Sequence, residues 1–286
     1  RWHLVRGAIL SAARPHAGRR PGLRIGGFTT EPDEGLPEVF FTPGARGTRE
    51  TVLLDDTRAD APRALWFPRF AVYHLHDTAP GAPLRTPARA GDDDTVRDDG
   101  GNLAAFLLRL AQSAQDSDRV AWGALNRRVR EIAPQVHRLR PTSTEGPGAP
   151  NAMVRLDWED AHGNVFGCHQ LSDGTLRSVA LLTALLQPPW ARPALMAFDE
   201  PELGLHPAAL ATIGAALRSA SALGQVLVAT QAPALLDEVD PACVVVSDHV
   251  DGGTILRRLD AKALHGWLEE YAVSDLWLMN VIGGQP

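Results

Sequence analysis

The sequence predicts an α/β protein with a mostly parallel sheet flanked by helices. From Leu171 onward, apolar runs of strand length alternate with longer amphipathic stretches, which is typical of βαβ units. Residues 194–198 (ALMAF) and 225–229 (QVLVA) are predicted as buried strands, with a helix at 207–223 between them. The other elements expected in this half are helices at 171–186, 233–238 and 261–271 and strands at 243–247 and 254–259.

Residues 1–100 are predicted to form a strand-rich N-terminal part. Its strand candidates are short apolar runs at 38–42, 51–55, 64–67 and 70–75. The acidic run DDDTVRDD at 92–99 is predicted to be a solvated loop. Paired carboxylates of this kind could also hold a metal ion or act as acid and base.

A short helical insertion and a linker are predicted for residues 101–150. Asn102 is the expected N-cap of a first helix, because Leu103, Phe106, Leu107 and Leu110 follow it at helical spacing. A second helix is expected at 120–132, and PTSTEGPGAP at 141–150 has the composition of a linker.

The last predicted region, residues 151–286, is the lobe that holds the candidate chemistry. It is expected to open with a β-hairpin formed by residues 152–158 and 164–169, and the alternating α/β half follows.

Composition limits the function classes. The chain has 286 residues, of which 44% are hydrophobic and 22% charged, and a net charge of −6 gives no overall basic footprint for nucleic acid. Cys168 and Cys243 are expected to be reduced thiols, and no apolar run reaches membrane-spanning length, so a cytoplasmic protein without a membrane partner is predicted. The Arg-rich, acid-free start at Arg1 favours an incomplete N-terminus over a transit peptide.

Two carboxylates follow the apolar run at residues 194–198. They would lie at the C-terminal edge of a buried strand, where ligands bind in open α/β sheets. Asp199 would hold a hydrated Mg²⁺, and Glu200 would orient and deprotonate an attacking water. The alternative is an acidic pair that only caps the structure after a core strand.

Two polar segments accompany this pair. LSDGTLR at residues 171–177 places Ser172 and Gly174 before a helix, where a hydroxyl and free N–H groups form an anion site. The alternative is an ordinary N-cap supplied by Ser172 or Asp173. The predicted strand at 225–229 ends in Thr230-Gln231, and the Gln231 amide could hydrogen-bond a phosphate or the attacking water.

In their order and spacing, these segments resemble ABC-type ATPase domains of the RecF/SMC branch. They resemble most closely the small bacterial AAA-labelled ATPases that carry LSDGTLR and EPELGLHP. Residues 170–177 match the ABC signature, 196–200 the Walker B strand, 202–207 the D-loop, and Gln231 the switch position. The likeness also includes YHLHDTAPGAPLR at 73–85, DDGGNLAAFLLRL at 98–110 and EEYAVSDLWLMNVIGG at 269–284.

The resemblance implies a P-loop NTPase-like fold, the ABC ATPase head, that binds ATP and Mg²⁺ and hydrolyses ATP with Glu200 and Gln231 as catalytic residues. It also implies a head-to-tail dimer in which two copies enclose two nucleotides. The residues implied to contact nucleotide or the dimer seam are Ser172, Asp173, Gly174, Arg177, Gly204 and His206. The implied settings are DNA repair, chromosome maintenance or phage defence, with DNA or a nuclease as possible partners.

Two departures from the family pattern affect these expectations. Gln231 replaces the switch histidine of transporter-type ABC proteins. No GxxxxGK[ST] phosphate-binding loop occurs, and Lys262, the only lysine, lies in LDAKALHG.

The chain is therefore predicted to be either a fragment whose upstream sequence carries that loop, or a non-hydrolysing regulatory subunit that lends its signature motif to a partner ATPase. A metal-dependent nuclease built on the aspartates of residues 244–252 is a minor alternative, because no glutamate-bearing strand accompanies them.

Overall fold

The computed structural model describes residues 2–5, 23–25, 39–42, 51–54, 70–145, 152–250, 253–260 and 262–284. The chain divides into two compact units, residues 8–70 and residues 1–7 with 71–286. The smaller unit contains an antiparallel sheet of β2 (Leu23–Ile25), β3 (Val39–Thr42) and β4 (Thr51–Leu54) in the order β2-β3-β4. The strands predicted at 38–42 and 51–55 are thus confirmed, whereas the one at 64–67 lies outside the described residues.

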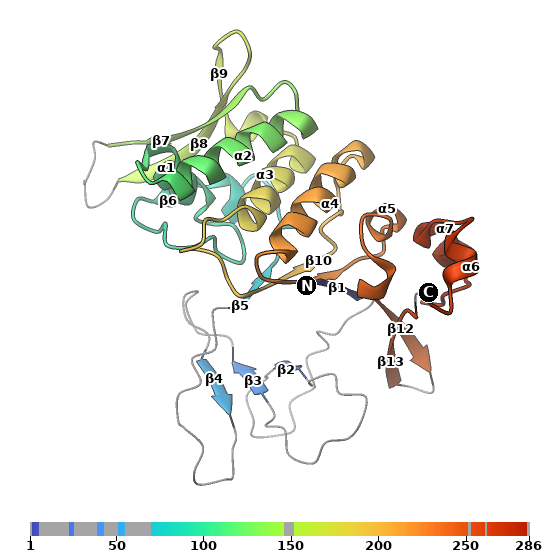
Figure 1. Ribbon diagram of the computed structural model, residues 1–286. Coiled ribbons are helices and arrows are strands. Elements are labelled where there is room, and N and C mark those ends of the chain that lie inside the picture. Colours follow the sequence, from blue (N-terminus) through green and yellow to red (C-terminus); the bar gives the residue numbers. More distant parts are fainter. Residues whose placement is uncertain are drawn as a thin grey trace. The chain divides into compact units, whose positions relative to one another are not determined.

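The larger unit is organised around a six-stranded sheet with the order β13-β12-β1-β11-β10-β5 (Figure 1). The neighbouring pairs β12–β1, β1–β11 and β11–β10 are parallel, and β13 is antiparallel to β12. This mostly parallel sheet confirms the predicted α/β class. The strands are β1 (Trp2–Val5), β5 (Phe70–Tyr73), β10 (Leu195–Asp199), β11 (Gln225–Ala229), β12 (Val244–Val250) and β13 (Gly253–Arg258).

Strand β1 has no counterpart among the sequence predictions. Its sequence, WHLV, is only four residues long and is flanked by arginines, so no pattern in the sequence predicts a strand there. In the sheet it nevertheless lies between β11 and β12, with Val5 paired to both Ala229 and Val245.

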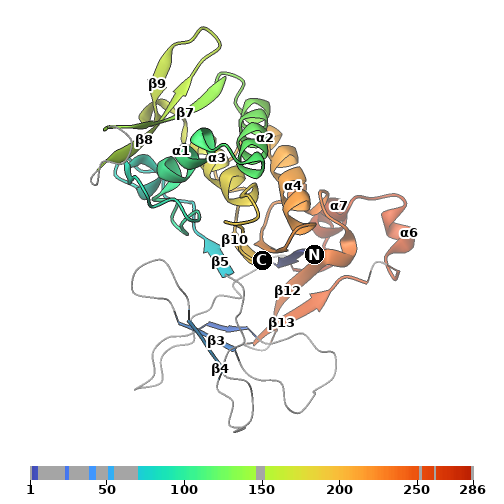
Figure 2. The same cartoon turned by 60° about the vertical axis from the view of Figure 1, so that its left-hand side comes forward.

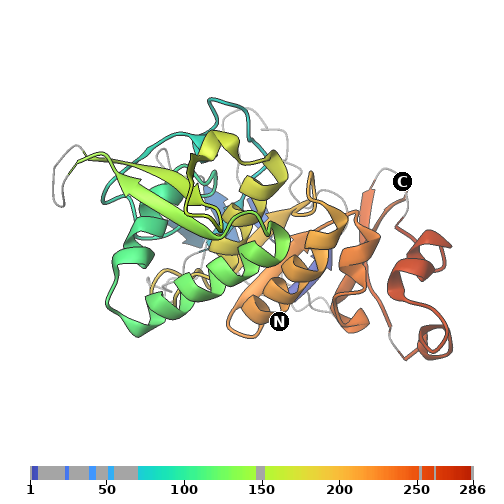
Figure 3. The same ribbon diagram turned by 90° about the horizontal axis from the view of Figure 1, so that it is seen from above.

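Helices pack against this sheet and against one another (Figures 1 and 2). Helix α3 is the most buried of them, because all but three of its thirteen residues are buried. Helices α2 and α4 lie side by side, as the long green and orange helices in Figure 3. No helix in the described ranges is both long and apolar enough to cross a membrane. The helices are α1 (Leu103–Gln112), α2 (Asp116–Ile132), α3 (Asp173–Leu185), α4 (Pro207–Ser221), α5 (Pro233–Leu236), α6 (His265–Leu268) and α7 (Val273–Leu278).

One side chain connects the helices to the edge strand and its loop. Gln187 is fully buried after α3, and its Oε1 accepts from the N–H of Val96 at 3.1 Å. Its Nε2 donates to the Tyr73 hydroxyl at 2.8 Å. The Tyr73 ring stacks on Phe198 of β10 with centroids 5.0 Å apart, so β5 and β10 share one aromatic contact.

A second antiparallel sheet lies beside α1 and contains β6, β8 and β7, with β9 paired to β8. Its β8–β9 pair confirms the predicted hairpin. The predicted linker at 141–150 is partly wrong, because its first three residues belong to β7, where Pro141 is paired with Leu156. The strands are β6 (Ala88–Arg89), β7 (Arg138–Ser143), β8 (Met153–Glu159) and β9 (Val165–Gly167).

Two further local predictions need correction. Asn102 is the N-cap residue of α1, as predicted, but its side chain makes no cap bond. The side chain is fully buried and donates to the carbonyls of Asp92 and Thr95 at 2.9 and 2.7 Å. It thereby holds the acidic loop, which is not merely solvated, since Arg109 also pairs with Asp93 at 3.3 Å. The helix predicted at 261–271 is confined to the short α6.

Candidate active site

The carboxylates of Asp199 and Glu200 lie where β10 ends. Asp199 is the last residue of β10 and is exposed, paired in the sheet with Ala229 at the end of β11. The N–H of Glu200 donates to the Ala229 carbonyl at 2.8 Å, so the sheet contact continues for one residue beyond the strand. The carboxyl ends of β10, β11 and β1 meet at this edge, with Val5 paired to the same Ala229. This is the edge where parallel α/β sheets bind ligands.

Glu200 has a backbone conformation that is unusual for its residue type. Its φ is 43°, in the left-handed region that favours glycine. A side chain there costs about 1–2 kcal/mol, and such strain often accompanies a functional residue. The turn is held by the Leu203 N–H, which donates to the Glu200 carbonyl at 3.0 Å.

Gln231 contacts two carboxylates of the neighbouring turn. Its Nε2 donates to Oε1 of Glu200 at 3.0 Å, and its backbone N–H donates to Oε1 of Glu202 at 3.1 Å. The other oxygen of Glu202 is buried and has no hydrogen-bond partner in the described part of the chain. The ends of β10 and β11 are thus joined through side chains as well as through the sheet.

Ser172 occupies the N-cap position of α3. Its Oγ accepts from the N–H of Thr175 at 3.2 Å and lies 2.8 Å from the Thr175 hydroxyl. The N–H groups of Asp173 and Gly174 belong to the first turn, where no helix carbonyl can accept from them. Ser172 and Asp173 are both exposed. The capping alternative is therefore observed, and it leaves an anion-attracting helix terminus facing solvent.

Residues 171–177 pack directly on the loop between β10 and α4. A Cβ on Gly174 would lie 2.6 Å from the backbone oxygen of Gly204, so only glycine fits there. Gly204 has a φ of +72°, and a Cβ on it would collide with the Arg177 guanidinium. Arg177 donates to the Leu203 carbonyl at 2.9 Å and to the His76 carbonyl. Gly174, Arg177 and Gly204 are thus brought together within one chain.

His206 caps the next helix. Its Nδ1 accepts from the N–H of Ala208 at 3.1 Å at the start of α4, and the residue is exposed. No group of three or more His, Cys, Asp or Glu side chains that could hold a metal ion occurs in the described ranges. Asp199 could therefore contribute to a Mg²⁺ site only together with water and phosphate oxygens, which is the usual arrangement for this ion.

The Asp199–Glu200 turn lines a small pocket with residues from β5 and α3. His76 and Arg177 are the other polar residues of this pocket, and Tyr73, Leu75, Leu181, Phe198, Pro201 and Leu203 complete the lining. His76 thus lies near the carboxylate pair, although its sequence context, HLHDT, carries no recognised spacing.

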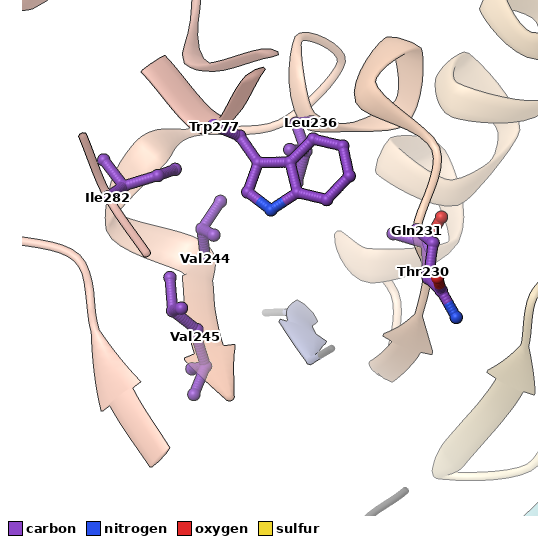
Figure 4. Close-up of a pocket in the computed structure, with 8 residues that line it drawn as sticks. Thr230, Gln231, Leu236, Val244, Val245, Trp277 and Ile282 are labelled. Carbon is purple, nitrogen blue, oxygen red and sulfur yellow. The ribbon is translucent and has the colours of Figure 1, made fainter. Parts of the chain in front are cut away.

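A second, mostly apolar pocket lies beside Thr230 and Gln231 (Figure 4). Thr230 and Gln231 lie on one side of it, and Trp277 and Ile282 lie across from them. The Trp277 indole donates to the Gly284 carbonyl at 3.4 Å. The remaining lining residues are Leu236, Val244, Val245 and Val246.

Arg85 has the largest effect on the charge of Asp173, at the start of α3. The Arg85 guanidinium donates to Asp173 Oδ1 at 2.7 Å, and this bond lowers the pKa of the Asp173 carboxyl. Burial raises the pKa of the Cys168 thiol, which precedes the loop. The sequence alone does not point to Glu202 or Arg85, because their partners Gln231 and Asp173 lie 29 and 88 residues away. Nor does it point to His76, which is related to the carboxylate pair only through the pocket that they line together.

Comparisons with known proteins extend this description. The family model described as "AAA domain, putative AbiEii toxin, Type IV TA system" matches residues 52–237. No curated protein matches the chain.

Among solved structures, the chain is similar to SMC head domains. Those of Pyrococcus furiosus, solved with the C-terminal domain of ScpA, and of Pyrococcus yayanosii are each 18% identical over 53% of this chain, with TM-scores of 0.43 and 0.42. The SMC head domain of Thermotoga maritima is 13% identical over 55% of this chain and 52% of its own, with a TM-score of 0.36. The chain spans 37% and 29% of the two Pyrococcus proteins.

Proposed function

We propose that the protein binds and hydrolyses ATP as a RecF/SMC-like head domain. The chain belongs to the family described as "AAA domain, putative AbiEii toxin, Type IV TA system". The observation that carries this proposal is the contact of Gln231 with Glu200 at the carboxyl edge of the parallel sheet. A carboxylate beside a fixed amide can hold one water molecule for attack on a phosphoryl group.

Asp199 is the proposed metal residue. It is exposed at the end of β10, and one carboxylate with phosphate oxygens and water suits Mg²⁺. When bound, the ion would neutralise charge on the phosphates. Asp199 would fix its position relative to Glu200, the next residue.

Glu200 is the proposed general base, oriented by Gln231. The Gln231 NH₂ group is engaged by Glu200 Oε1, which leaves the Gln231 carbonyl oxygen available to accept from a water. Glu200 Oε2 can take the other proton of the same water. The two side chains together would therefore orient the nucleophile and remove its proton.

Ser172, Asp173 and Gly174 are proposed to contact nucleotide bound to a second copy. If Thr175 donates to Ser172 Oγ in their 2.8 Å contact, the Ser172 proton is free for a phosphate oxygen. The first-turn N–H groups of α3 add donors at the positive end of the helix. In this head-to-tail dimer, Gly204 and His206 would lie near the seam, and Arg177 would brace the Gly204 loop against α3.

A second candidate function follows from the missing phosphate loop. The motif GxxxxGK[ST] occurs neither in the residues that follow β1, from Arg6 onward, nor in any other segment of the sequence. Lys262 is exposed and follows β13, away from the carboxyl edge of β10. A non-hydrolysing subunit that supplies Ser172 and Gly174 to a partner ATPase would need no such loop.

The biological setting is proposed by family analogy alone. DNA repair, chromosome maintenance or phage defence in the cytoplasm would suit an ATP-driven head, and DNA or a nuclease would be its partner.

Mixed subunits test the enzyme proposal in the full-length gene product. Glu200→Gln removes the base of one site, whereas Ser172→Arg blocks the contact made to the opposite site. Each variant alone is expected to be inactive, and a 1:1 mixture should recover about a quarter of normal turnover, because half of randomly assorted dimers keep one intact site.

Two results would count against ATP hydrolysis in a head-to-tail dimer. An unsubstituted protein without turnover excludes hydrolysis, and stimulation of a partner ATPase by that protein would establish the second candidate. Turnover without recovery in the mixture excludes the head-to-tail site.

A further inference from the structure

We infer that Arg85 is a positioning residue that fixes the shape of the signature loop, and through it the place of Ser172. The inference rests on the proposed function, because it assigns Arg85 to the half-site that Ser172 offers to a second copy. Arg85 ends the short helical turn Pro83–Arg85, far in sequence from the loop it contacts.

Arg85 makes hydrogen bonds in two directions. Its Nε donates to the carbonyl of Thr78 at 2.7 Å, which anchors the side chain to its own loop. Its terminal nitrogens donate to the carbonyls of Cys168 and Leu171 at 2.8 and 3.2 Å, and to Asp173 Oδ1 at 2.7 Å. The acceptors therefore lie on both sides of Ser172 in the chain.

This arrangement requires a guanidinium group. The Arg85 side chain is only 9% exposed, so its charge needs several partners, whereas Asp173 is 65% exposed. A planar fork with five N–H donors can reach carbonyls and a carboxylate at once, and an ammonium group cannot. Replacing Arg85 would leave the carbonyls of Cys168 and Leu171 without these donors.

Before Ser172, the loop is also held by other contacts, among them that of Cys168 Sγ with the Leu84 carbonyl at 3.9 Å. Its own bonds are Leu171 N–H to the Cys168 carbonyl at 3.1 Å and Gly167 N–H to Gln170 Oε1 at 2.9 Å. Ser172 follows directly and begins α3. A donor contact to phosphate depends on placement to within a fraction of an ångström, and a 1 Å displacement can lower a rate about 100-fold.

The anchor of Arg85 is shared with the loop that follows β10. Arg177 donates to the His76 carbonyl and to the Leu203 carbonyl, while Arg85 donates to the Thr78 carbonyl. The short segment at 76–78 is thus tied by one arginine to the signature loop and by the other to the Leu203 turn. Arg85 thereby couples the position of Ser172 to the turn that begins at Glu200.

The test uses Arg85→Gln and Arg85→Lys in the full-length protein, with Arg89→Gln as the matched control because Arg89 is exposed in β6. We expect kcat to fall at least 10-fold in both Arg85 variants and the KM for ATP to change less than 3-fold. Hydrogen exchange should quicken at the amides of Leu171 and Thr175. Arg89→Gln should match the unsubstituted protein in all three measurements.

Mixing separates positioning from general damage. Arg85→Gln with Glu200→Gln should regain turnover, because the defects fall on opposite halves of the composite site. Arg85→Gln with Ser172→Arg should not, because both defects fall on the same half. Recovery in the second mixture, an unchanged kcat, or unchanged exchange at Leu171 would overturn the role of Arg85. Absence of turnover in the unsubstituted protein would instead overturn the proposed function, and this role with it.

Discussion

The side-chain amide of Gln231 donates a hydrogen bond of 3.0 Å to Oε1 of Glu200, although the two residues are 31 positions apart. The contact joins the ends of two adjacent parallel strands at their carboxyl edge. Because Glu202 receives the Gln231 backbone N–H at 3.1 Å, a single residue is held by two carboxylates of one turn. Substitutions in this turn should therefore change the positions of both Glu200, the proposed base, and the Gln231 amide that orients it.

Glu202→Ala tests that dependence. Loss of the acceptor for the Gln231 N–H should let the amide move away from Glu200, and we expect a fall in kcat of about 10-fold, the scale of one lost hydrogen bond. Steady-state ATP turnover measures it. Glu270→Ala, at an exposed position, is the control and should leave kcat unchanged. An unaltered kcat in Glu202→Ala would show that the bond does not position Gln231.

The left-handed backbone of Glu200 gives a stability prediction. Glu200→Gly and Glu200→Ala both remove the carboxylate, but only glycine adopts a φ of 43° without strain. The glycine variant should be more stable than the alanine variant by about 1 kcal/mol, as measured by denaturant unfolding. Equal stabilities, or a more stable alanine variant, would mean that the turn carries no such strain.

Gly174→Ala should damage the contact between the signature segment and the loop before α4. The added Cβ would lie 2.6 Å from the Gly204 carbonyl oxygen, and backbone atoms cannot yield as a flexible side chain would. A destabilisation of about 1–3 kcal/mol is expected from overpacking, together with lower turnover.

The control is the same substitution at Gly123 in α2, where a Cβ meets no atom within 4 Å. Gly123→Ala should stabilise the protein by about 0.5–1 kcal/mol through helix propensity. Thermal unfolding of both variants beside the unsubstituted protein measures these changes in stability. A Gly174→Ala variant as stable as the unsubstituted protein would contradict the close contact.

Cys168 gives the pH prediction. Burial raises the pKa of its thiol in the folded protein, so the folded state keeps the proton at pH values where the unfolded state loses it. Stability from this group is therefore complete below the ordinary thiol pKa of about 8.5 and declines as the pH rises above it.

The measurement is denaturant unfolding between pH 7 and pH 10, roughly spanning that ordinary value. The unsubstituted protein should lose more stability over this interval than Cys168→Ala, whatever the cost of the substitution itself. Parallel pH dependences in the two proteins would show that the thiol is not shielded in the folded state.

Local patterning in the sequence predicts much of the sheet core. Residues 194–198 and 225–229 are apolar runs of strand length, and they become β10 and β11. The helix between them follows from its 3.6-residue spacing, and α4 begins at the predicted Pro207. These strands could be predicted because a strand within a parallel sheet has apolar residues on both faces, which gives a continuous apolar run in the sequence.

Elements defined by distant partners were not predictable in this way. Residues 141–143 have the composition of a linker and include Pro141, but they form the end of β7. Their pairing with β8 stabilises a strand that the composition does not predict. Asn102 has the residue type of a cap, but it is fully buried and bonds to the acidic loop. The positions of Glu202 and Arg85 depend on contacts across the fold that no spacing rule describes.

In the proposed mechanism, Glu200 is the base of an ATP-hydrolysing site. The direct measurement is ATP binding and turnover by the full-length protein and by Glu200→Gln, which keeps the shape of the side chain but cannot accept the proton. We predict normal ATP affinity in the variant and a fall in kcat of at least about 100-fold. A Glu200→Gln protein that binds ATP normally and hydrolyses it as fast as its parent would exclude Glu200 as the base.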